Sequence, residues 1–420
     1  MSDAVQDQYE AFPYPARDPK DENRRLVEGS PSHILEINHY LFAGRRDFRQ
    51  PFRALFAGGG TGDGVIMLAQ QLADAGTPAE LLHLDISAAA RRIAETRAAE
   101  RGLGSIRFVT GPIEAIPSLD LGRFDYIDCC GVLHHLADPA AGLALLAGAL
   151  APDGGIGLMV YGALGRTGVY PMQALIRLLA PAAPLADRVG LARRLLRRLP
   201  QTNWLARNPA VADHVAGGDA GLVDLLLHAR DRAYLVPELR QLIEGAGLAL
   251  AGLVEPWRYE PESYLADPAL EARFAGLDRW ERAAAAELLA GNLKTHVAYV
   301  VPKARDGLTV ADPASGDAVP VLKGGDGQAF ARQLRPGGVL TLRSDGLELR
   351  FPVPEGAGPV LAQIDGRRSR SAIAAALAAA EPGRWRGDRF DRAFEATYRL
   401  FHRLNRLFIG GRPGGVSGAS

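Results

Sequence analysis

Ten residues at positions 55–64, LFAGGGTGDG, constrain the fold of this chain more than any other segment. The residues Leu55, Phe56 and Ala57 are typical of the end of a buried strand, and the apolar residues after the glycines recur at helical spacing. Glycines at alternate positions let a backbone turn sharply and let a ligand approach without meeting a Cβ atom. A helix that begins there presents unpaired N–H groups to an anionic group. The segment therefore predicts a strand, a ligand-binding turn and a helix.

The spacing of the glycines narrows the choice of ligand. A dinucleotide-binding loop of the form G-x-G-x-x-G needs a third glycine five residues after the first. Counted from Gly58, Gly60 or Gly62, that position never holds glycine, and no Lys-Ser/Thr pair follows to make a phosphate-binding loop. The pattern is G-x-G-x-G instead, which argues against a nicotinamide-dependent oxidoreductase.

Strands and helices alternate after this turn, which predicts a mostly parallel, doubly wound α/β sheet. Ligands of such sheets lie at the carboxyl ends of the strands, beside the point where the strand order reverses. Asp85 ends the second expected strand, where a carboxylate can accept hydrogen bonds from both hydroxyls of a ribose. Asp85 and Ser87 could instead only cap the next helix. Further strands are expected at 80–86, 105–111, 124–136 and 150–162, with helices at 87–101 and 140–150.

Three motifs resemble those of a known family. The glycine loop, FDYIDCCGVLHHLADP at 124–139 and LAPDGGIGLMVY at 150–161 resemble class I S-adenosylmethionine (SAM) dependent methyltransferases, in particular the bacterial type 11/12 group. QYEAFPYPARD at 8–18 is similar to a YExxPYP element that precedes the SAM-binding fold in some of these proteins. The resemblance covers residues 8 to about 305 and implies a seven-stranded Rossmann-like sheet, SAM as cofactor and methyl transfer to an acceptor that the motifs do not identify.

The sequence departs from the family pattern in two ways. An acidic residue often precedes the glycines in this family, whereas Phe56 and Ala57 stand there, and Pro112 replaces an Asp that often meets the adenine amino group. Adenine recognition is therefore expected from the Ile113 backbone and from apolar packing. The resemblance implies cofactor contacts at the ends of the first four strands, at Ala57, Gly58, Gly59, Gly60, Thr61, Gly62, Asp85, Ile86, Gly111, Pro112, Ile113, Cys130 and Gly131.

Candidates for the chemical step follow the fourth strand. The sulfonium of SAM is already activated, so transfer mainly requires an acceptor held in line at about 3–3.5 Å. A base is useful only when the nucleophile must lose a proton. His134 is the first candidate for a base or an acceptor contact and His135 the second, although His135 could only pack against the following turn. Secondary candidates for acceptor binding, each of which could also be structural, are Tyr14, Tyr161, Tyr170, His228 and Tyr234, the last two on an expected polar loop.

Residues 163–235 depart from the rhythm of the sheet and predict a cap of two or three helices inserted over the mouth of the site. Between Arg166 and Arg207 eight arginines stand against one acid. A solvated helix face explains this excess, and attraction to an anionic acceptor, a carrier-bound substrate, nucleic acid or an acidic membrane surface are alternatives. A helix at 268–290 and two more strands are then expected to complete a methyltransferase domain at 51–305.

The N-terminal residues 1–50 predict a lid and a lead-in helix. Pro13 and Pro15 stiffen the segment YEAFPYP, and its aromatic side chains have apolar area to bury. We expect the segment to fold over the cofactor.

The composition shifts after Pro302 and predicts a small α+β module at 306–409, with a hairpin across 344–346 and a last helix at 388–408. GPVLAQIDGRRSRSAIAAAL at 358–377 resembles the helix–turn–helix of a winged-helix or PqqD-type peptide-binding module. Substrate presentation or homodimerisation is favoured for this module, and binding of nucleic acid is disfavoured. Residues 410–420 predict a disordered tail.

Composition bounds the setting. The 420 residues suggest two or three domains, and 47% hydrophobic residues can bury a large core. With 48 basic and 48 acidic residues, net charge predicts no particular partner. The adjacent Cys129 and Cys130 cannot form a disulfide framework, and neither a leader nor a membrane span is recognised, so we expect a cytoplasmic protein. No set of His, Cys and carboxylate residues has the spacing of a metal site, so we expect no metal. An active methyltransferase is favoured, and the alternative is a non-catalytic SAM-sensing regulator acting through the C-terminal module.

Overall fold

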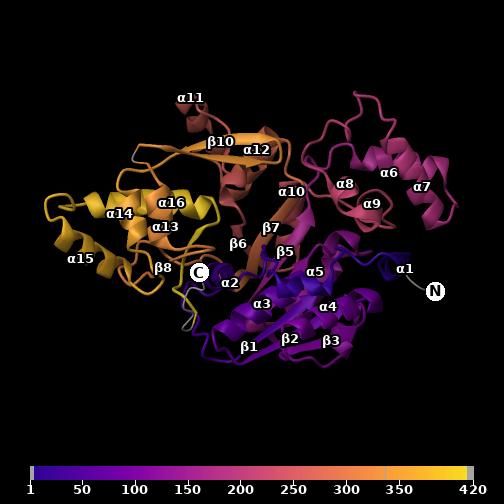
Figure 1. Ribbon diagram of the computed structural model, residues 1–420, viewed down its shortest axis with the longest axis horizontal. Coiled ribbons are helices and arrows are strands. Elements are labelled where there is room, and N and C mark those ends of the chain that lie inside the picture. The colour runs from indigo at the N-terminus through magenta and orange to yellow at the C-terminus, as the bar shows by residue number, and fades with distance from the viewer. Residues whose placement is uncertain (1–3, 336, 414–420) are drawn as a thin grey trace.

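A computed structural model describes residues 4–335 and 337–413. Its centre is a seven-stranded sheet in the order β3-β2-β1-β4-β5-β7-β6, seen at the lower centre of Figure 1. The first five strands pair in parallel, and β7 runs antiparallel to both β5 and β6. This topology confirms the predicted doubly wound, mostly parallel sheet, whose order reverses between β1 and β4. The strands are β1 Phe52–Ala57, β2 Ala79–Asp85, β3 Ile106–Thr110, β4 Phe124–Cys130, β5 Leu150–Tyr161, β6 Leu248–Leu253 and β7 Thr295–Pro302.

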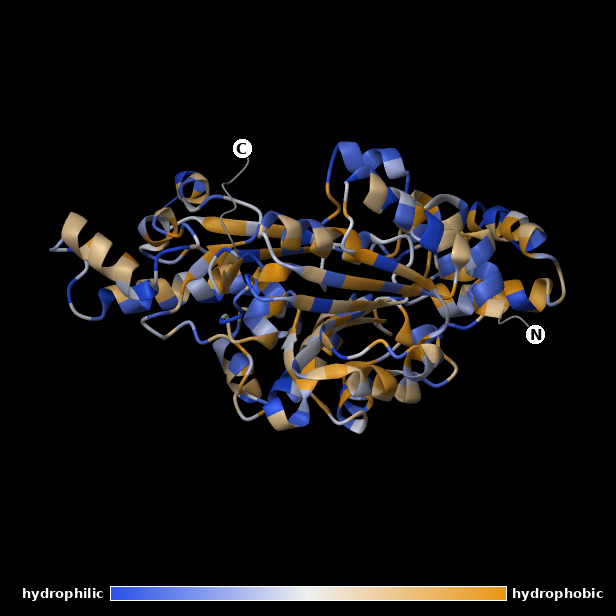
Figure 2. Ribbon diagram, turned by 90° about the horizontal axis from the view of Figure 1, so that it is seen from below, coloured by the Kyte–Doolittle hydropathy of each residue, from blue (hydrophilic) through white to orange (hydrophobic). Residues whose placement is uncertain are grey.

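Two hydrophobic cores lie on the two faces of this sheet, because side chains of successive strand residues point to opposite faces. One core joins the sheet to α5, α10 and α12, and the other joins it to α2 and α3. Figure 2 shows hydrophobic residues concentrated along the central strands. The helices of this part are α1 Ala4–Ala11, η1 Pro19–Asn23, α2 Ile34–Leu41, α3 Asp63–Asp74, α4 Ala88–Glu100, η2 Ile113–Ser118, η3 Leu133–His135, α5 Pro139–Gly148, α10 Val236–Gly245, η4 Pro256–Tyr259, η5 Pro261–Ser263, α11 Pro268–Glu271, η6 Ala272–Phe274 and α12 Arg279–Ala290.

The segment between β5 and α10 forms a helical group with its own core, at the upper right of Figure 1. Val169, Met172 and Ile176 of one helix pack against Leu222 and Leu226 of another. The short helix α8 was not among the two or three predicted helices. The elements of this group are α6 Val169–Leu179, α7 Leu185–Leu196, α8 Asp213–Ala216 and α9 Gly218–Leu226.

The C-terminal residues form a third group, drawn in orange and yellow in Figure 1. Its core also takes in Trp257 of η4, so it packs directly on the sheet-bearing part. The predicted hairpin is present, and Asp345 and Gly346 adopt the positive φ angles of 50° and 84° that a tight two-residue turn requires. The elements are η7 Lys303–Arg305, β8 Pro320–Leu322, α13 Gly327–Gln333, β9 Val339–Ser344, β10 Leu347–Pro352, α14 Ala357–Ala362, α15 Arg370–Ala380, α16 Arg389–Arg403 and β11 Leu407–Ile409.

Three expected elements have other bounds. The fourth strand ends at Cys130 rather than at 136, and the chain continues through a turn of 3-10 helix. The helix expected at 268–290 is broken, because Asp278 accepts hydrogen bonds from the next turn and starts a separate helix with a capping box. The helix expected at 388–408 ends at Arg403, since Asn405 has a φ of 57° and turns the chain into β11, which pairs with β8.

The first residues of the expected disordered tail form backbone hydrogen bonds. The Gly410 N–H donates to the Val319 carbonyl at 2.9 Å, and the Arg412 N–H donates to the Gly366 carbonyl at 2.8 Å. Residues 414–420, the rest of the expected tail, lie outside the described residues.

A chain of buried hydrogen bonds starts at Asp128 of β4. The Ser32 hydroxyl donates to the Asp128 carboxylate at 2.5 Å and lies 2.9 Å from the Tyr126 hydroxyl. The Ser32 N–H donates to the Tyr299 hydroxyl at 3.1 Å, and Tyr299 in turn donates to Glu36 at 2.9 Å. A buried polar group must find such partners, so this chain of bonds fixes α2 against the sheet.

The same Glu36 carboxylate connects the sheet to the C-terminal group. It accepts a hydrogen bond from Lys323 at 2.5 Å and another from the Asn405 amide at 2.9 Å. Glu36 is fully buried, and the adjacent ammonium group outweighs the effect of burial and lowers the pKa of this carboxyl. The Lys323–Glu36 pair therefore favours a fixed placement of the C-terminal group on the sheet-bearing part.

Asp128 gives a testable pH dependence of stability. Burial raises its pKa to about 6, so the folded protein holds this proton more tightly than the unfolded chain, whose Asp pKa is about 3.9. The resulting stabilisation is complete below pH ~4 and is lost as the pH rises through ~6. We expect Asp128→Asn, whose amide can donate to Ser32, to gain about 2–3 kcal/mol relative to the original protein between these pH values. Urea unfolding of both proteins at pH 4, 5, 6 and 7 measures the difference, and parallel profiles would contradict the account.

Candidate active site

The loop after β1 occupies the carboxyl edge of the sheet between β2 and β4. The Gly58 N–H donates to the Leu84 carbonyl at 2.7 Å, and the φ angles of Gly58, Gly60 and Gly62 are 76°, 53° and 101°. Residues with a Cβ rarely adopt this left-handed region. A Cβ at Gly58 would also lie 2.3 Å from a methyl group of Val132. Both the turn and its packing therefore require glycine.

Asp85 holds this loop in place. One oxygen of its carboxylate accepts the Gly60 N–H at 2.7 Å, and the other accepts the Ser87 N–H at 2.8 Å. The Ser87 hydroxyl caps α4 by accepting the Ala90 N–H at 3.0 Å. Burial raises the pKa of Asp85, and the neighbouring His83 opposes this rise. The capping function considered from the sequence is thus present, and each carboxylate oxygen keeps a further acceptor site.

The other positions expected to contact the cofactor lie at the same edge. The Gly111 N–H donates to the Asp85 carbonyl at 2.8 Å, and Pro112 precedes the buried Ile113 at the start of η2. Gly131, directly after β4, has a φ of 79°. The edge therefore offers a carboxylate, a helix N-terminus at α3 and glycine turns, and this set of donors and acceptors fits a ligand with a ribose and a carboxylate.

The N-terminal segment lies across the glycine loop. The Thr61 hydroxyl donates to the Pro15 carbonyl at 2.8 Å, and the Arg17 guanidinium pairs with Asp63 of the first turn of α3 at 2.5 Å. The carbonyl oxygen of Tyr14 would lie 3.1 Å from a Cβ added at Gly60. The backbone of the segment is therefore in close contact with the loop.

The same segment covers the turn between β2 and α4. The Ser87 hydroxyl donates to the Tyr9 carbonyl at 3.1 Å, and the Glu10 carboxylate accepts the Ala89 N–H of the first turn of α4 at 3.2 Å. A carboxylate at a helix N-terminus is stabilised by the helix dipole. Helix α1 thus supplies an acidic cap to a helix that is far from it in sequence.

Six side chains meet between η3, the end of β5 and α9, and we call them the polar cluster. The Tyr9 and Tyr161 hydroxyls each donate to the Asp224 carboxylate, at 3.1 and 2.9 Å. The rings of His135 and His228 stack at a centroid distance of 3.7 Å, and those of His134 and Tyr161 lie 3.9 Å apart. The cluster consists of Tyr9, His134, His135, Tyr161, Asp224 and His228.

A hydrogen bond determines which ring nitrogen of His135 carries the hydrogen. Its Nδ1 lies 2.8 Å from the Arg230 carbonyl, which can only accept, so Nδ1 carries the hydrogen. Its Nε2 is buried and has no hydrogen-bond partner among the described residues, and neither ring nitrogen of His134 has one. Burial lowers the pKa of both imidazoles, which keeps them neutral at neutral pH. His135 therefore presents a free lone pair inside the cluster.

Three members of the cluster, His135, Asp224 and His228, bring possible metal-ligand atoms within 4.8 Å of one another. The His228 Nδ1 accepts the Arg230 N–H at 3.0 Å, so in the neutral ring the hydrogen is on Nε2, 3.1 Å from the Tyr9 hydroxyl. Burial lowers the pKa of His228 to about 2, which excludes a second ring proton at neutral pH. Because both ring nitrogens of His228 take part in hydrogen bonds, the three residues are better described as a hydrogen-bonded set than as a metal site.

The remaining acceptor candidates are placed differently. The Tyr14 hydroxyl lies 3.5 Å from Asp213 of α8, and Tyr170 lies beside the Arg166 guanidinium. Tyr234 packs in the core shared by the sheet and α10, so it is not in the polar cluster. The expected polar loop is partly buried: the Asp231 and Arg166 side chains pair at 2.9 Å and are nearly inaccessible, and His228 is buried, whereas Arg232 is exposed.

Sequence reasoning missed Asp224 and Tyr9 as parts of this site. Asp224 was detectable, because it is a single carboxylate in the apolar helical run GLVDLLL, where an unpaired charge is costly. The part played by Tyr9 depends on how the N-terminal segment folds back over 200 residues of chain, and no local pattern indicates it.

Comparisons with known proteins agree with this geometry. Residues 55–156 match the family described as a methyltransferase domain. An uncharacterized protein of Synechococcus sp. is 32% identical over 299 residues, which are 69% of each chain. The structure of PKMT2 from Rickettsia typhi in complex with AdoHcy aligns over 90% of this chain and 75% of that one, with a TM-score of 0.60 and 14% identity. A second structure of PKMT2 from Rickettsia typhi gives a TM-score of 0.59 and 15% identity, and both likenesses concern the fold.

The matched family, the relative and the fold lead to one assignment. The matched residues 55–156 run from β1 to β5 and contain the glycine loop, Asp85 and the turn after β4. The chain belongs to the class I SAM-dependent methyltransferases, and SAM is its cofactor.

Proposed function

We propose that this protein transfers the methyl group of SAM to an oxygen, nitrogen or carbon nucleophile of an acceptor that enters the polar cluster. The acceptor is a small molecule, a carrier-bound compound or a protein. The observation that carries the proposal is the short connection between the two sites. Gly131 ends the cofactor edge of β4, and His134 and His135 follow within the next four residues. A cofactor at this edge and an acceptor in the cluster are therefore neighbours.

The cofactor edge supplies the contacts for SAM. The free lone pairs of Asp85 accept the ribose hydroxyls, and the first turn of α3 faces the carboxylate of the amino-acid part. Ile113 contributes apolar packing and its backbone to the adenine ring. When bound, SAM supplies an activated methyl group on a sulfonium.

His135 is proposed as the base for a nucleophile that must lose a proton. The neutral ring accepts this proton at Nε2, while the hydrogen bond from Nδ1 to the Arg230 carbonyl keeps its orientation. Asp224 favours the protonated ring, since its charge raises the pKa that burial lowers. His134, whose two nitrogens are free of hydrogen bonds within residues 4–335 and 337–413, is proposed as an acceptor contact together with Tyr161. Free imidazole nitrogens favour catalysis over a non-catalytic SAM sensor.

The surrounding segments are proposed to serve this reaction. Residues 1–50 act as a lid and lead-in helix, 51–305 as the methyltransferase domain, 163–235 as its cap and 306–409 as an accessory module. No helix within the described residues is long and apolar enough to cross a membrane. The thiols of Cys129 and Cys130 are free, which supports a reducing compartment such as the cytoplasm.

Methyl transfer is tested with labelled SAM and a bacterial extract separated into protein, nucleic acid and small molecules. We expect label in one fraction. If the acceptor must lose a proton, His135→Gln lowers kcat by about 10²–10⁴-fold with unchanged SAM affinity. His214→Gln is the matched control, because this histidine lies on α8 outside the cluster. Absence of label from every fraction would contradict the proposed function. Full activity of His135→Gln would refute the role of His135 as the base.

Deletion of residues 1–20 tests the lid. The deletion removes the Arg17–Asp63 pair, the Glu10 cap on α4 and the contact of Tyr14 with the glycine loop. We expect the Kd for SAM to rise about tenfold or more, because such a rise corresponds to the loss of at least one charge-assisted hydrogen bond. Calorimetry measures it, with Lys20→Ala, an exposed substitution in the same segment, as control. Equal SAM affinity and turnover in the deleted and full-length proteins would refute a lid.

A further inference from the structure

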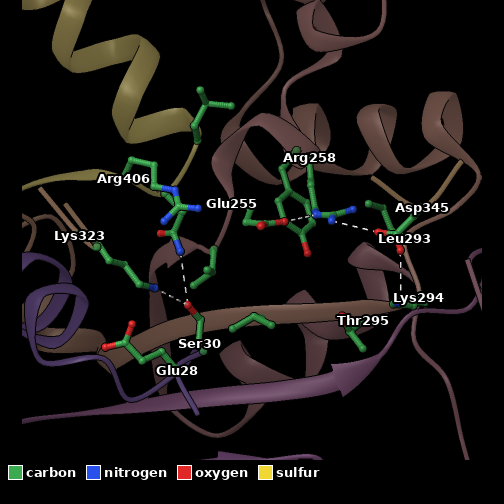
Figure 3. A pocket seen from close by; sticks show the side chains of 17 residues that line it. Glu28, Ser30, Glu255, Arg258, Leu293, Lys294, Thr295, Lys323, Asp345 and Arg406 are labelled. Atoms are coloured by element: carbon green, nitrogen blue, oxygen red, sulfur yellow. Dashed lines mark hydrogen bonds and ion pairs between the residues drawn. The ribbon is translucent and has the colours of Figure 1, made fainter. Parts of the chain in front are cut away.

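A cavity of about 460 Å³ lies between the sheet and the C-terminal group, and Figure 3 shows the side chains around it. Ser30 and Thr295 line the side formed by the sheet-bearing part, and Lys323, Asp345 and Arg406 line the opposite side. The volume lies within the range of about 300–1,000 Å³ that is usual for ligand sites. This cavity is separate from the glycine loop, none of whose residues line it.

One end of the cavity adjoins the polar cluster. Thr295 of β7 is the direct antiparallel partner of Tyr161 of β5. Directly opposed residues on antiparallel strands share a face, with Cβ atoms about 4.5–5.5 Å apart. Thr295 lines the cavity and Tyr161 belongs to the cluster, so the cavity reaches to within one side chain of the proposed acceptor position.

Most charges in the walls are already paired. Arg258 and Lys294 both contact Asp345, at 3.0 and 3.2 Å, and Arg258 also bonds to Glu255. Lys323 pairs with the buried Glu36. The wall is therefore polar but nearly balanced in charge. A nucleic acid is disfavoured as the ligand, because its phosphates require excess positive charge, and an apolar chain is disfavoured because the wall is polar.

At the other end, two adjacent residues each have a side-chain polar group without a partner among the described residues. The amide nitrogen of Asn405 donates to Glu36 at 2.9 Å, which leaves its carbonyl oxygen Oδ1 as a buried acceptor with no partner among the described residues. Asn405 is only 9% exposed. The Arg406 guanidinium has no hydrogen bond or ion pair to any described residue, and Figure 3 shows it between Lys323 and Glu255. A buried acceptor without a donor is costly, so it indicates an absent ligand group.

We propose that this cavity binds an extended polypeptide segment of the methyl acceptor. An N–H group of that segment donates to Asn405 Oδ1, and a carbonyl group next to it accepts from Arg406. Neighbouring N–H and C=O groups are what every residue of a peptide offers, so the pair recognises main chain rather than one side chain. The segment then continues past Thr295, and its nucleophile enters the polar cluster. This inference rests on the proposed methyl transfer and assigns the acceptor to the peptides.

The test uses labelled SAM and a tryptic digest of a bacterial extract freed of small molecules and nucleic acid. Initial rates are measured against digest concentration for the original protein, Arg406→Glu and Arg399→Glu. Arg399 is an exposed residue of α16 that pairs with Glu395 on the helix surface, so it is the matched control. We expect label in peptides. For Arg406→Glu, the digest concentration that gives half of the maximal rate should be about tenfold or more higher than for the original protein, which is the usual effect of losing a charge-assisted hydrogen bond. The effect falls on this concentration rather than on the maximal rate, and Arg399→Glu behaves as the original protein.

Two further measurements make the outcome decisive. Melting temperatures of the variants establish that they fold, which is expected because the Arg406 side chain has no native hydrogen bond or ion pair to lose within the described residues. Calorimetry with SAM separates this inference from the function on which it rests. If SAM binds but label enters only small molecules or nucleic acid, or if Arg406→Glu and the original protein give the same peptide curve, the peptide site is refuted and methyl transfer stands. If SAM does not bind, both are refuted.

Discussion

The Asp85 carboxylate holds together the two turns on which the cofactor edge is built. Its two oxygens accept N–H groups from Gly60, in the loop after β1, and from Ser87, in the turn after β2. Hydrogen bonds to a charged group contribute about 1.5–3 kcal/mol each, enough to keep a glycine loop in one conformation. Burial nevertheless raises the pKa of Asp85, so its charge is costly in the absence of a ligand. A ligand that donates hydroxyl groups to this carboxylate offsets that cost.

Helix α1 links the two halves of the proposed site. Glu10 caps α4 at the cofactor edge, while Tyr9, its neighbour, donates to Asp224 in the polar cluster. The Tyr9 hydroxyl also contacts His228 at 3.1 Å. One turn of helix thus contacts the elements around the cofactor edge and the elements around the polar cluster. These contacts support the lid proposed for this segment.

The parts of the fold that could be predicted are those with a local cause. Alternate glycines at 58–62 and the acid at position 85 indicate the loop and its anchor, and strand and helix periods indicate the sheet. The unpredicted parts depend on partners distant in sequence. His135 is orientated by a carbonyl 95 residues away, and Asn405 ends α16 because its left-handed turn lets β11 pair with β8. Hydrophobic periodicity contains no information on either contact.

SAM calorimetry on a pair of glycine variants tests the central claim most directly. Gly60 and Gly76 both have positive φ angles, 53° and 69°, so alanine costs a similar backbone strain of about 1–2 kcal/mol at each position. Only Gly60 lies in the loop, under the Tyr14 carbonyl, whereas a Cβ at Gly76 meets nothing within 4 Å. The account predicts SAM binding by the original protein and by Gly76→Ala, and a Kd raised about 100-fold or more in Gly60→Ala. No heat with SAM in the original protein, or equal affinity in Gly60→Ala, would contradict it.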